Sequence, residues 1–487
     1  MAEFIIANMA PLMFGALVLF LLFGYPVAFA LAANGIVFGL LGIELGLLTP
    51  ALFQALPERI FGIMANDTLL AIPFFTFMGL VLERSGMAED LLDTIGQLFG
   101  PMRGGLAFAV IFVGALLAAT TGVVAASVIS MGLISLPIML RYGYDKRLAS
   151  GVIAASGTLA QIIPPSLVLI IMADQLGRSV GDMYEGAMVP GLVLTGLYVG
   201  YVALVALLKP SAAPALPPEA RSLRGAKLML RVITTLVPPL VLIFLVLGTI
   251  FLGIATPTEG GAMGAAGALI LAIVRKRLSW KLLKQAMETT GKLSSFVVFI
   301  LVGSTVFGLV FRGVNGDLWV EHLLLGLPGG QVGFLIVVNI LVFLLAFFLD
   351  FFELSFIIVP LLAPVADKLG IDLVWFGVLL AVNMQTSFMH PPFGFALFYL
   401  RSVAPASVKT TDIYWGAIPF VCIQILMVAI IIIFPNIVSY GDPAEKARLE
   451  QQGDVDLSTM MQDGDATQAP TEDSAADLLK NLQSNDK

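Results

Sequence analysis

Polar side chains within long apolar runs are the residues of this sequence best placed to do chemistry. Asp350 lies inside the apolar run 347–352, and Thr120, Thr121 and Gly122 interrupt another such run. A carboxylate within an apolar span is costly and is usually functional. A broken helix leaves carbonyl oxygens that suit a cation at one end and amides that suit a carboxylate at the other. These groups predict binding of ions and organic acids.

We predict two cation sites, one in each half of the chain. Their ligands are oxygen atoms beside helix breaks or Pro-Pro pairs. The first site comprises Thr120, Thr121, Gly122, Ser127, Pro164 and Ser166, with the backbone of 161–166, and the second comprises Asp350, Gln385, Thr386, Ser387 and Pro391. We predict that the substrate contacts Ser304, Thr305, Asp350 and His390.

Each of these residues also has a plainer interpretation. An isolated Ser or Thr in a helix often hydrogen-bonds to its own backbone. Asp350 could make a structural hydrogen bond within the bundle, and Glu353, one turn away, shares its argument with less force. His390 could be a proton relay or a substrate donor, but the sequence favours a packing side chain at a helix break. The clustering beside breaks keeps the functional interpretation open.

Signals for covalent catalysis are missing from the sequence. Two His and one Cys supply no zinc site and no disulfide framework. There is no G-x-S-x-G, H-E-x-x-H or nucleotide-binding P-loop motif. We therefore predict that the protein is not an enzyme and that an ion gradient supplies its energy. A membrane-embedded protease or lipid transferase is the disfavoured alternative.

The composition places these residues in a membrane protein. The 487 residues are 59% apolar and 12% charged, with a mean hydropathy of +0.98. Soluble domains average about half apolar and a quarter charged, so the apolar exterior must face lipid. The net charge of −7 lies entirely in 441–487, which we predict to be disordered and outside the membrane. No Lys or Arg precedes the first apolar run, so we read it as a retained span.

Apolar windows predict the following spans: 4–23, 26–48, 104–140, 148–174, 184–208, 231–253, 257–274, 333–365, 373–400 and 414–436. The runs 104–140 and 333–365 exceed one crossing and read as broken helices. The stretches 66–86 and 291–312 read as re-entrant hairpins, interrupted at Pro73 and at 303–305. Basic residues at 141–147, 209–231, 275–292 and 401–409 mark the cytoplasmic face.

The two halves of the chain repeat each other. At one constant offset Pro137 recurs as Pro364, Asp145 as Asp372 and the pair 164–165 as 391–392, and at a slightly longer offset Gly79 recurs as Gly308. The loop 141–147 carries a net charge of +2, whereas its mate 366–372 carries −1. The positive-inside rule places these loops on opposite faces, so the repeats are predicted to be inverted, as in secondary transporters.

This pattern predicts an all-α polytopic membrane protein with two inverted repeats, re-entrant hairpins and broken helices. The predicted divisions are an N-terminal scaffold pair (1–50), repeat 1 (51–208), a cytoplasmic linker with connecting spans (209–280), repeat 2 (281–437) and the disordered acidic tail (438–487).

Three motifs resemble a known family. The segments 69–79 (LLAIPFFTFMG), 163–166 (IPPS) and 385–394 (QTSFMHPPFG) are similar to the large membrane subunit, DctM type, of tripartite ATP-independent periplasmic (TRAP) transporters. The resemblance extends from about residue 5 to residue 437. His390 departs from it, because the family usually places Thr before the Pro-Pro pair, so Thr386 or backbone oxygen would substitute for that hydroxyl.

The resemblance implies an elevator-type symporter of the bacterial inner membrane that moves sodium with a small organic acid. It also implies two partners, a small four-helix membrane subunit (DctQ type) and a periplasmic substrate-binding protein (DctP type), and no nucleic acid. The motifs 348–353 and 393–398 resemble the branch associated with 2-oxo acids and other monocarboxylates. The alternative is a single-component sodium/dicarboxylate symporter.

Overall fold

The computed structural model describes residues 2–121, 124–221, 223–347 and 349–440. Every regular element in these ranges is helical, and none of the described residues lies in a β-strand. Seven described helices are long and apolar enough to cross a bilayer, or nine if each of two bent pairs counts as one span. The predicted all-α membrane fold is confirmed. Nearly all of the predicted tail lies outside the described ranges.

The elements follow one another in a similar order in the two halves of the chain. The first half contains α1 (Ala2–Ala7), α2 (Met9–Leu22), α3 (Val27–Glu44), η1 (Pro50–Ala55), α4 (Leu56–Met64), α5 (Asp67–Arg84), α6 (Met87–Phe99), α7 (Gly105–Thr121), α8 (Val124–Arg141), α9 (Lys146–Thr158), η2 (Leu159–Gln161), α10 (Leu167–Leu176) and α11 (Val180–Leu208). The second half follows a short turn, η3 (Pro218–Ala220), and contains α12 (Gly225–Phe251), α13 (Pro257–Val274), α14 (Trp280–Gly313), α15 (Gly316–Leu325), α16 (Gly330–Leu345), α17 (Phe351–Glu353), η4 (Leu354–Ile358), α18 (Val359–Lys368), α19 (Leu373–Gln385), η5 (Thr386–Phe388), α20 (Phe395–Val403), α21 (Thr410–Ile433) and η6 (Pro435–Ile437).

Helices α9 and α19 show the repeat at the level of individual caps. Each has 13 residues, and α19 begins and ends at the positions that the repeat makes equivalent to the ends of α9. An Asp side chain caps each N-terminus: Asp145 accepts from the backbone N–H of Arg147 at 2.9 Å, and Asp372 accepts from that of Trp375 at 2.8 Å. A single 3₁₀ turn follows each helix, again at equivalent positions.

The two equivalent helices run toward each other along α21. Helix α9 packs against α21 from its first turn, where Arg147 Nε lies 4.0 Å from Asp412 Oδ1. Helix α19 starts at the other end of α21, where Trp375 Nε1 donates to the carbonyl of Ile431 at 3.2 Å. The opposite directions agree with the inversion predicted from the loop charges.

The run 104–140 is a hairpin, which corrects the prediction of a broken helix that continues across the membrane. Helices α7 and α8 pack side by side, and both pack on α9. Gly114 of α7 contacts Ser156, and Val128 of α8 contacts Gly157, the next residue of α9. The predicted break is correct, since α7 ends at Thr121. The predicted path of the chain after the break was wrong, because two apolar segments look alike in sequence whether the chain continues across the membrane or folds back.

The run 333–365 also folds back on itself. Its break lies between α16 and α17, at the predicted Asp350. Gln331 Nε2 at the start of α16 donates to the carbonyl of Leu369, just after α18, at 2.6 Å. The run 104–140 is closed in the same way, because the backbone N–H of Leu106 donates to Tyr144 Oη at 3.2 Å. We call 105–141 hairpin 1 and 330–368 hairpin 2.

The stretches 66–86 and 291–312 are not re-entrant hairpins. Pro73 lies inside the continuous helix α5, and the 45° bend lies earlier, between α4 and α5. Helix α14 runs unbroken for 34 residues, about 51 Å at 1.5 Å per residue. Gly303 does not break α14. A glycine stands there because a side chain would collide with the carbonyl of Ala28 in α3. A small residue at this position lets two helices approach closely.

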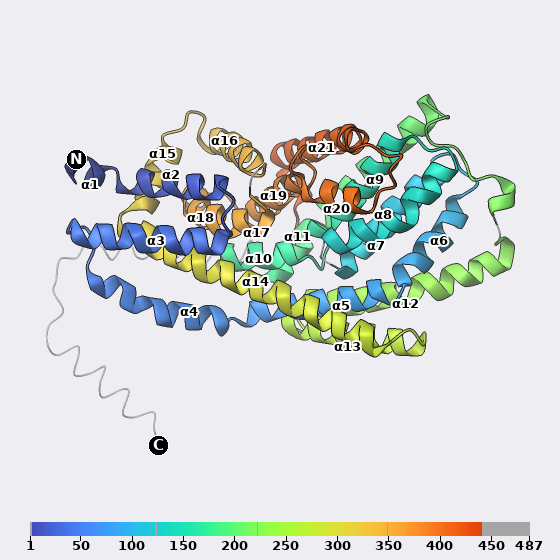
Figure 1. The fold of residues 1–487 in the computed structure, drawn as a ribbon, viewed down its shortest axis with the longest axis horizontal. Coiled ribbons are helices and arrows are strands. Elements are labelled where there is room, and N and C mark those ends of the chain that lie inside the picture. Colours follow the sequence, from blue (N-terminus) through green and yellow to red (C-terminus); the bar gives the residue numbers. More distant parts are fainter. Residues whose placement is uncertain (1, 122–123, 222, 348, 441–487) are drawn as a thin grey trace, which may run out of the picture. The chain divides into compact units, whose positions relative to one another are not determined.

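Helices α3, α5, α13 and α14 form the frame beside which the hairpins lie (Figure 1). Helix α5 packs along α13, and α14 packs along both α3 and α5. The linker between α11 and α12 spans 209–224, because α12 begins at Gly225. Backbone hydrogen bonds of 2.9 Å join this linker to the base of hairpin 1, from Gly104 N to Ala213 O and from Leu216 N to Gly100 O.

Candidate functional site

The C-terminal ends of α9 and α19 meet at a buried contact between equivalent residues. Gln385 Nε2 donates to Thr158 Oγ1 at 3.1 Å, and these residues are 227 positions apart. Thr158 Oγ1 in turn donates to the carbonyl of Ala155 at 2.8 Å. A contact between a residue and its own counterpart lies on the axis that relates the repeats. The two Pro-Pro loops leave the helices beside this contact.

Several buried oxygen atoms at this junction have no hydrogen-bond partner among the described residues. They are Gln161 Oε1, Gln385 Oε1, Ser387 Oγ and Ser156 Oγ. An unsatisfied buried acceptor costs about 1–3 kcal/mol, so several of them at one place call for a partner such as water or an ion. Neutral amide and hydroxyl oxygens suit a hard cation that prefers oxygen ligands. Gln385 and Ser387, two of the ligands predicted for the second cation site, thus both lie buried at this junction.

A cavity of about 280 Å³ lies against this junction and brings the two repeats together. Gln161 and the first residues of α8 line it from one half, and Asp350 lines it from the other. Asp350 caps the short helix α17, accepting from the backbone N–H of Glu353 at 2.9 Å, while Glu353 Oε2 accepts from the N–H of Asp350 at 3.0 Å. A carboxylate has about four acceptor positions, so this capping box leaves room on Asp350 for another partner.

The remaining walls of this cavity are apolar and mostly aromatic. Phe296, Phe351, Phe352, Phe388, Phe395 and Tyr399 line it, and no Lys or Arg is among its described lining residues. Apolar walls lower the local dielectric and so strengthen any electrostatic interaction inside. Sequence reasoning missed Phe296, because it comes from α14 of the frame and faces the cavity from outside both hairpins.

The structure gives local roles to several predicted cation ligands. Ser166 caps α10, accepting from the N–H of Val168 at 3.2 Å, and donates to the carbonyl of Gln161 at 2.6 Å. Thr386 Oγ1 donates to the carbonyl of Asn383 at 2.7 Å. Each oxygen can still accept a further ligand. Ser127 is buried in α8 and also has an interaction partner.

The rest of the first predicted site is only partly described. The side chains of Thr120 and Thr121 lie outside the described part of the structure, as does Gly122. Pro164 and Pro391 occupy equivalent places in the Pro-Pro loops, and both Pro-Pro bonds are cis. Pro164 lines a different, apolar cavity of about 510 Å³ between α7, α11 and α12.

The predicted substrate residues do not all come together. Ser304 donates to the carbonyl of Phe356 at 2.6 Å, and with Thr305 it lines a separate cavity of about 200 Å³. His390 packs between the rings of Phe343 and Phe347, each with its centroid 4.3 Å away, as in the plainer interpretation. Only Asp350 of the four lines the cavity at the junction.

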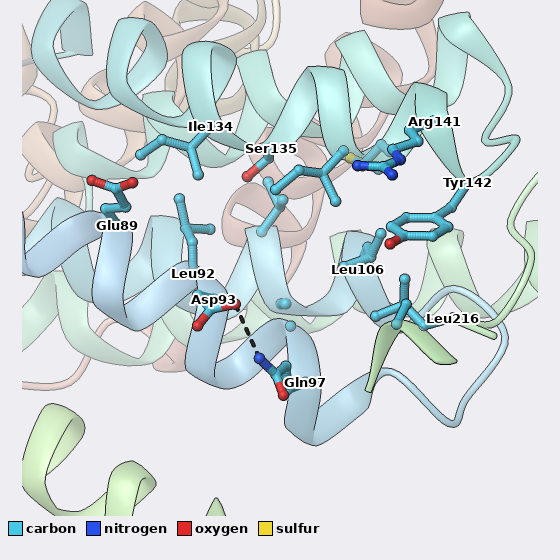
Figure 2. A pocket seen from close by; sticks show the side chains of 16 residues that line it. Glu89, Leu92, Asp93, Gln97, Leu106, Ile134, Ser135, Arg141, Tyr142 and Leu216 are labelled. Atoms are coloured by element: carbon cyan, nitrogen blue, oxygen red, sulfur yellow. Dashed lines mark hydrogen bonds between the residues drawn. The ribbon is translucent and has the colours of Figure 1, made fainter. Parts of the chain in front are cut away.

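A further cavity of about 350 Å³ lies at the base of hairpin 1. Figure 2 shows Glu89 and Asp93 of α6 on one side and Ser135, Arg141 and Tyr142 on the other. Gln97 Nε2 donates to Asp93 Oδ1 at 3.1 Å within it. It opens between α6 and α8, away from the junction.

Comparisons with known proteins agree with this architecture. The family model of the DctM component of tripartite ATP-independent periplasmic transporters matches residues 14–437. The C4-dicarboxylate TRAP transporter large permease protein DctM of Pseudomonas aeruginosa is 30% identical over 396 residues, covering 80% of this chain and 90% of that protein. The sialic acid TRAP transporter large permease protein SiaM of Vibrio cholerae is 26% identical over 416 residues, covering 85% and 93%.

A solved structure shows a similar fold. The crystal structure of the Alcanivorax borkumensis YdaH transporter has a TM-score of 0.56 at 15% identity, covering 79% of this chain and 88% of that one. The named relatives are transporter subunits and not enzymes. With seven or more apolar helices, the protein is a multi-pass protein of the bacterial inner membrane. The chain belongs to the DctM family, the large permease subunits of TRAP transporters.

Proposed function

We propose that this large permease uses a sodium gradient to take up a small organic acid. Large permeases of this family work with a small membrane subunit and a periplasmic binding protein. The proposed substrate is a carboxylate, and the motifs 348–353 and 393–398 favour a 2-oxo acid or another monocarboxylate. Relatives are named for C4-dicarboxylates and for sialic acid, which are also organic acids.

The unpartnered oxygens at the junction carry this proposal. Gln161, Gln385 and Ser387 each present a buried oxygen without a partner among the described residues, where two equivalent chain breaks meet. No group of three or more His, Cys, Asp or Glu that could hold a metal occurs among the described residues. A monovalent cation held by neutral oxygens fits this donor set better than a transition metal.

The charge of the adjoining cavity supports coupling between ion and substrate. Asp350 lines the cavity, and no Lys or Arg does so among the described residues. A carboxylate entering beside Asp350 would meet a like charge, which is destabilising at low dielectric. A bound sodium ion supplies the missing positive charge. Substrate binding would therefore depend on sodium, as symport requires.

We propose an elevator-type movement as the route across the membrane. In it the hairpins and the Pro-Pro loops would carry the junction past the frame of α3, α5, α13 and α14. The frame touches the cavity through Phe296, so the substrate would lie between a moving body and a fixed one. Alternating access by movement of one bundle against another is common in transporters with internal repeats.

The test is uptake into proteoliposomes containing the permease and the small membrane subunit, with the binding protein added outside. We expect accumulation of a labelled 2-oxo acid under an inward sodium gradient and none with potassium. Asp350→Ala and the double change Thr120→Ala/Thr121→Ala should abolish uptake while leaving membrane insertion intact. Unchanged uptake in both variants would contradict the site. Uptake of free substrate by the permease alone would favour the single-component symporter.

A further inference from the structure

Two unpaired arginines line the cavity of about 200 Å³ between α14 and hairpin 2. Arg59 comes from α4 and Arg312 from the last turn of α14, at the face predicted to be periplasmic. Both residues are exposed, and neither guanidinium forms an ion pair or hydrogen bond with any described residue. We call this space the outer cavity, and we call the cavity lined by Asp350 the junction cavity.

The carboxylate of the outer cavity is already satisfied by neutral groups. Asp174 is the only acidic side chain among its described lining residues. Its Oδ1 accepts from Asn66 Nδ2 at 2.6 Å, and its Oδ2 accepts from Gln175 Nε2 at 2.8 Å. Two arginines and one aspartate give the described lining a net charge of +1. The cavity therefore has unused positive charge for a further anion.

The outer cavity also holds two of the residues predicted to contact the substrate. Ser304 and Thr305 of α14 both line it. Ser304 already donates to the carbonyl of Phe356 at 2.6 Å, whereas the Thr305 hydroxyl makes no hydrogen bond to a described residue. A guanidinium fork matches the two oxygens of a carboxylate, and a hydroxyl can donate to either of them. These groups suit a small organic anion.

The outer cavity and the junction cavity lie close together along two helices. On α14, Phe296 lines the junction cavity and Leu301 lines the outer cavity, a separation of about 7.5 Å at 1.5 Å per residue. On α10, Val168 lines the junction cavity and Asp174 lines the outer cavity, a separation of about 9 Å by the same rise. One to two helical turns therefore separate the two spaces.

Hairpin 2 closes the way between the two cavities. Phe352 lines the junction cavity, and Phe356, four residues further along the hairpin, lines the outer cavity. Ser355 between them is fully buried, with its Oγ 3.6 Å from Sδ of Met172 in α10. On the other side, Ser304 holds the carbonyl of Phe356 to α14. An anion in the outer cavity is thus next to the junction cavity but not yet in it.

We propose that the outer cavity is a second binding site for a small carboxylate, held by Arg59 and Arg312, where the anionic substrate binds before it reaches the junction cavity. The proposal rests on the proposed function, which supplies the anionic substrate. Helix α4 packs on α14 of the frame, so both arginines stay in place when the hairpins move. Movement of the hairpins along α14 toward Arg312 brings the junction cavity to the bound anion.

The charges of the two cavities give their binding different ion requirements. The described lining of the junction cavity contains Asp350 and no Lys or Arg, so a carboxylate there depends on sodium for positive charge. The outer cavity supplies that charge through its arginines. Binding of a carboxylate to the outer cavity is therefore independent of sodium, which separates the two sites experimentally.

Thermal unfolding of the purified complex of permease and small subunit tests the outer site. The probe is potassium pyruvate, a small 2-oxo acid, compared with potassium chloride and with neutral pyruvamide, without sodium and without the binding protein. We expect pyruvate alone to raise the unfolding temperature of the wild type. Arg59→Gln and Arg312→Gln should each weaken this binding by roughly tenfold, the effect of losing one charge-assisted hydrogen bond, and the double variant should lose it.

Two control variants keep the result specific to the outer cavity. Arg178→Gln removes an arginine at the same face that does not line the cavity and lies 3.9 Å from Asp367, so it should keep the full pyruvate shift. Asp350→Asn alters the junction cavity and should keep it as well. No pyruvate shift in the wild type, or a wild-type shift in the double arginine variant, would overturn the proposal.

Uptake distinguishes an anion site from a docking contact with the binding protein. In proteoliposomes, Arg312→Gln should raise the concentration of loaded binding protein needed for half-maximal uptake and should weaken pyruvate binding in parallel. Reduced uptake with unchanged pyruvate binding would assign the arginines to docking and overturn the proposal. The binding measurement contains no sodium, so failure of sodium-driven uptake would contradict the proposed function and leave the outer site standing.

Discussion

Replacing Gln385 by Leu separates a cation ligand from a packing residue. The amide is fully buried, its Nε2 donates to Thr158 Oγ1 at 3.1 Å, and its Oε1 has no partner among the described residues. Leu has a similar size and makes neither interaction. Thr158 keeps its bond to the carbonyl of Ala155, so no new donor is stranded.

The two contributions to stability have opposite signs. Losing the hydrogen bond costs about 0.5–1.5 kcal/mol, and removing an unsatisfied buried acceptor returns about 1–3 kcal/mol. Without sodium we therefore expect Gln385→Leu to unfold at the same temperature as the wild type or higher. With sodium at about 100 times its dissociation constant, the wild type gains about 2.7 kcal/mol, and the variant lacks most of that gain.

The assay is thermal unfolding of the purified protein in detergent, with sodium chloride compared against choline chloride. Asn34→Leu is the matched control, because Asn34 is also fully buried, donates to the carbonyl of Met13 at 3.1 Å and has an Oδ1 without a partner among the described residues, but lies in α3. The control should keep the full sodium shift. An equal sodium shift in Gln385→Leu and the wild type would refute the assignment of Gln385 as a ligand.

Two further changes test the cavity and the packing. Asp350→Asn keeps a good helix cap, so it should leave the unfolding temperature nearly unchanged. It should lower uptake by about tenfold, because a loss of ~1.4 kcal/mol in ion affinity is a factor of ten. Normal uptake would exclude a role for the charge of Asp350. Gly151→Ala would push a methyl group into the backbone of Gly416 where α9 meets α21, and should destabilise the protein by about 1–3 kcal/mol. Gly200→Ala, where nothing lies within 4 Å, should not, and equal unfolding temperatures would contradict this packing argument.

The sequence was informative about where the chain breaks and less so about where it goes next. Thr121 and Asp350 mark true breaks, because polar residues and a cap are visible as letters. Whether the next segment continues or folds back depends on packing against α9 and α19. The sequences of two apolar segments do not show this packing. Gly303 misled for a related reason, since a glycine at a helix contact looks like one at a break.

The candidate site was predictable to a similar extent. The importance of Gln385 follows from motif and repeat, and the structure places it at the junction with Thr158. The pairing of Ser304 with hairpin 2 could not be foreseen, because it depends on how far the hairpin lies along α14. The unpartnered oxygen of Gln161 was accessible in principle, since the backbone of 161–166 was already predicted to contribute to the first cation site.

The contact between Thr158 and Gln385 has an evolutionary consequence. After a gene duplication, the residue on the symmetry axis faces an identical copy of itself, and two identical side chains must share one donor and one acceptor role. Here the copies have diverged into an amide that donates and a hydroxyl that accepts. A substitution at one of these two positions therefore changes which side chains are tolerated at the other. Positions 158 and 385 should covary across related genes, although they lie in opposite halves of the chain.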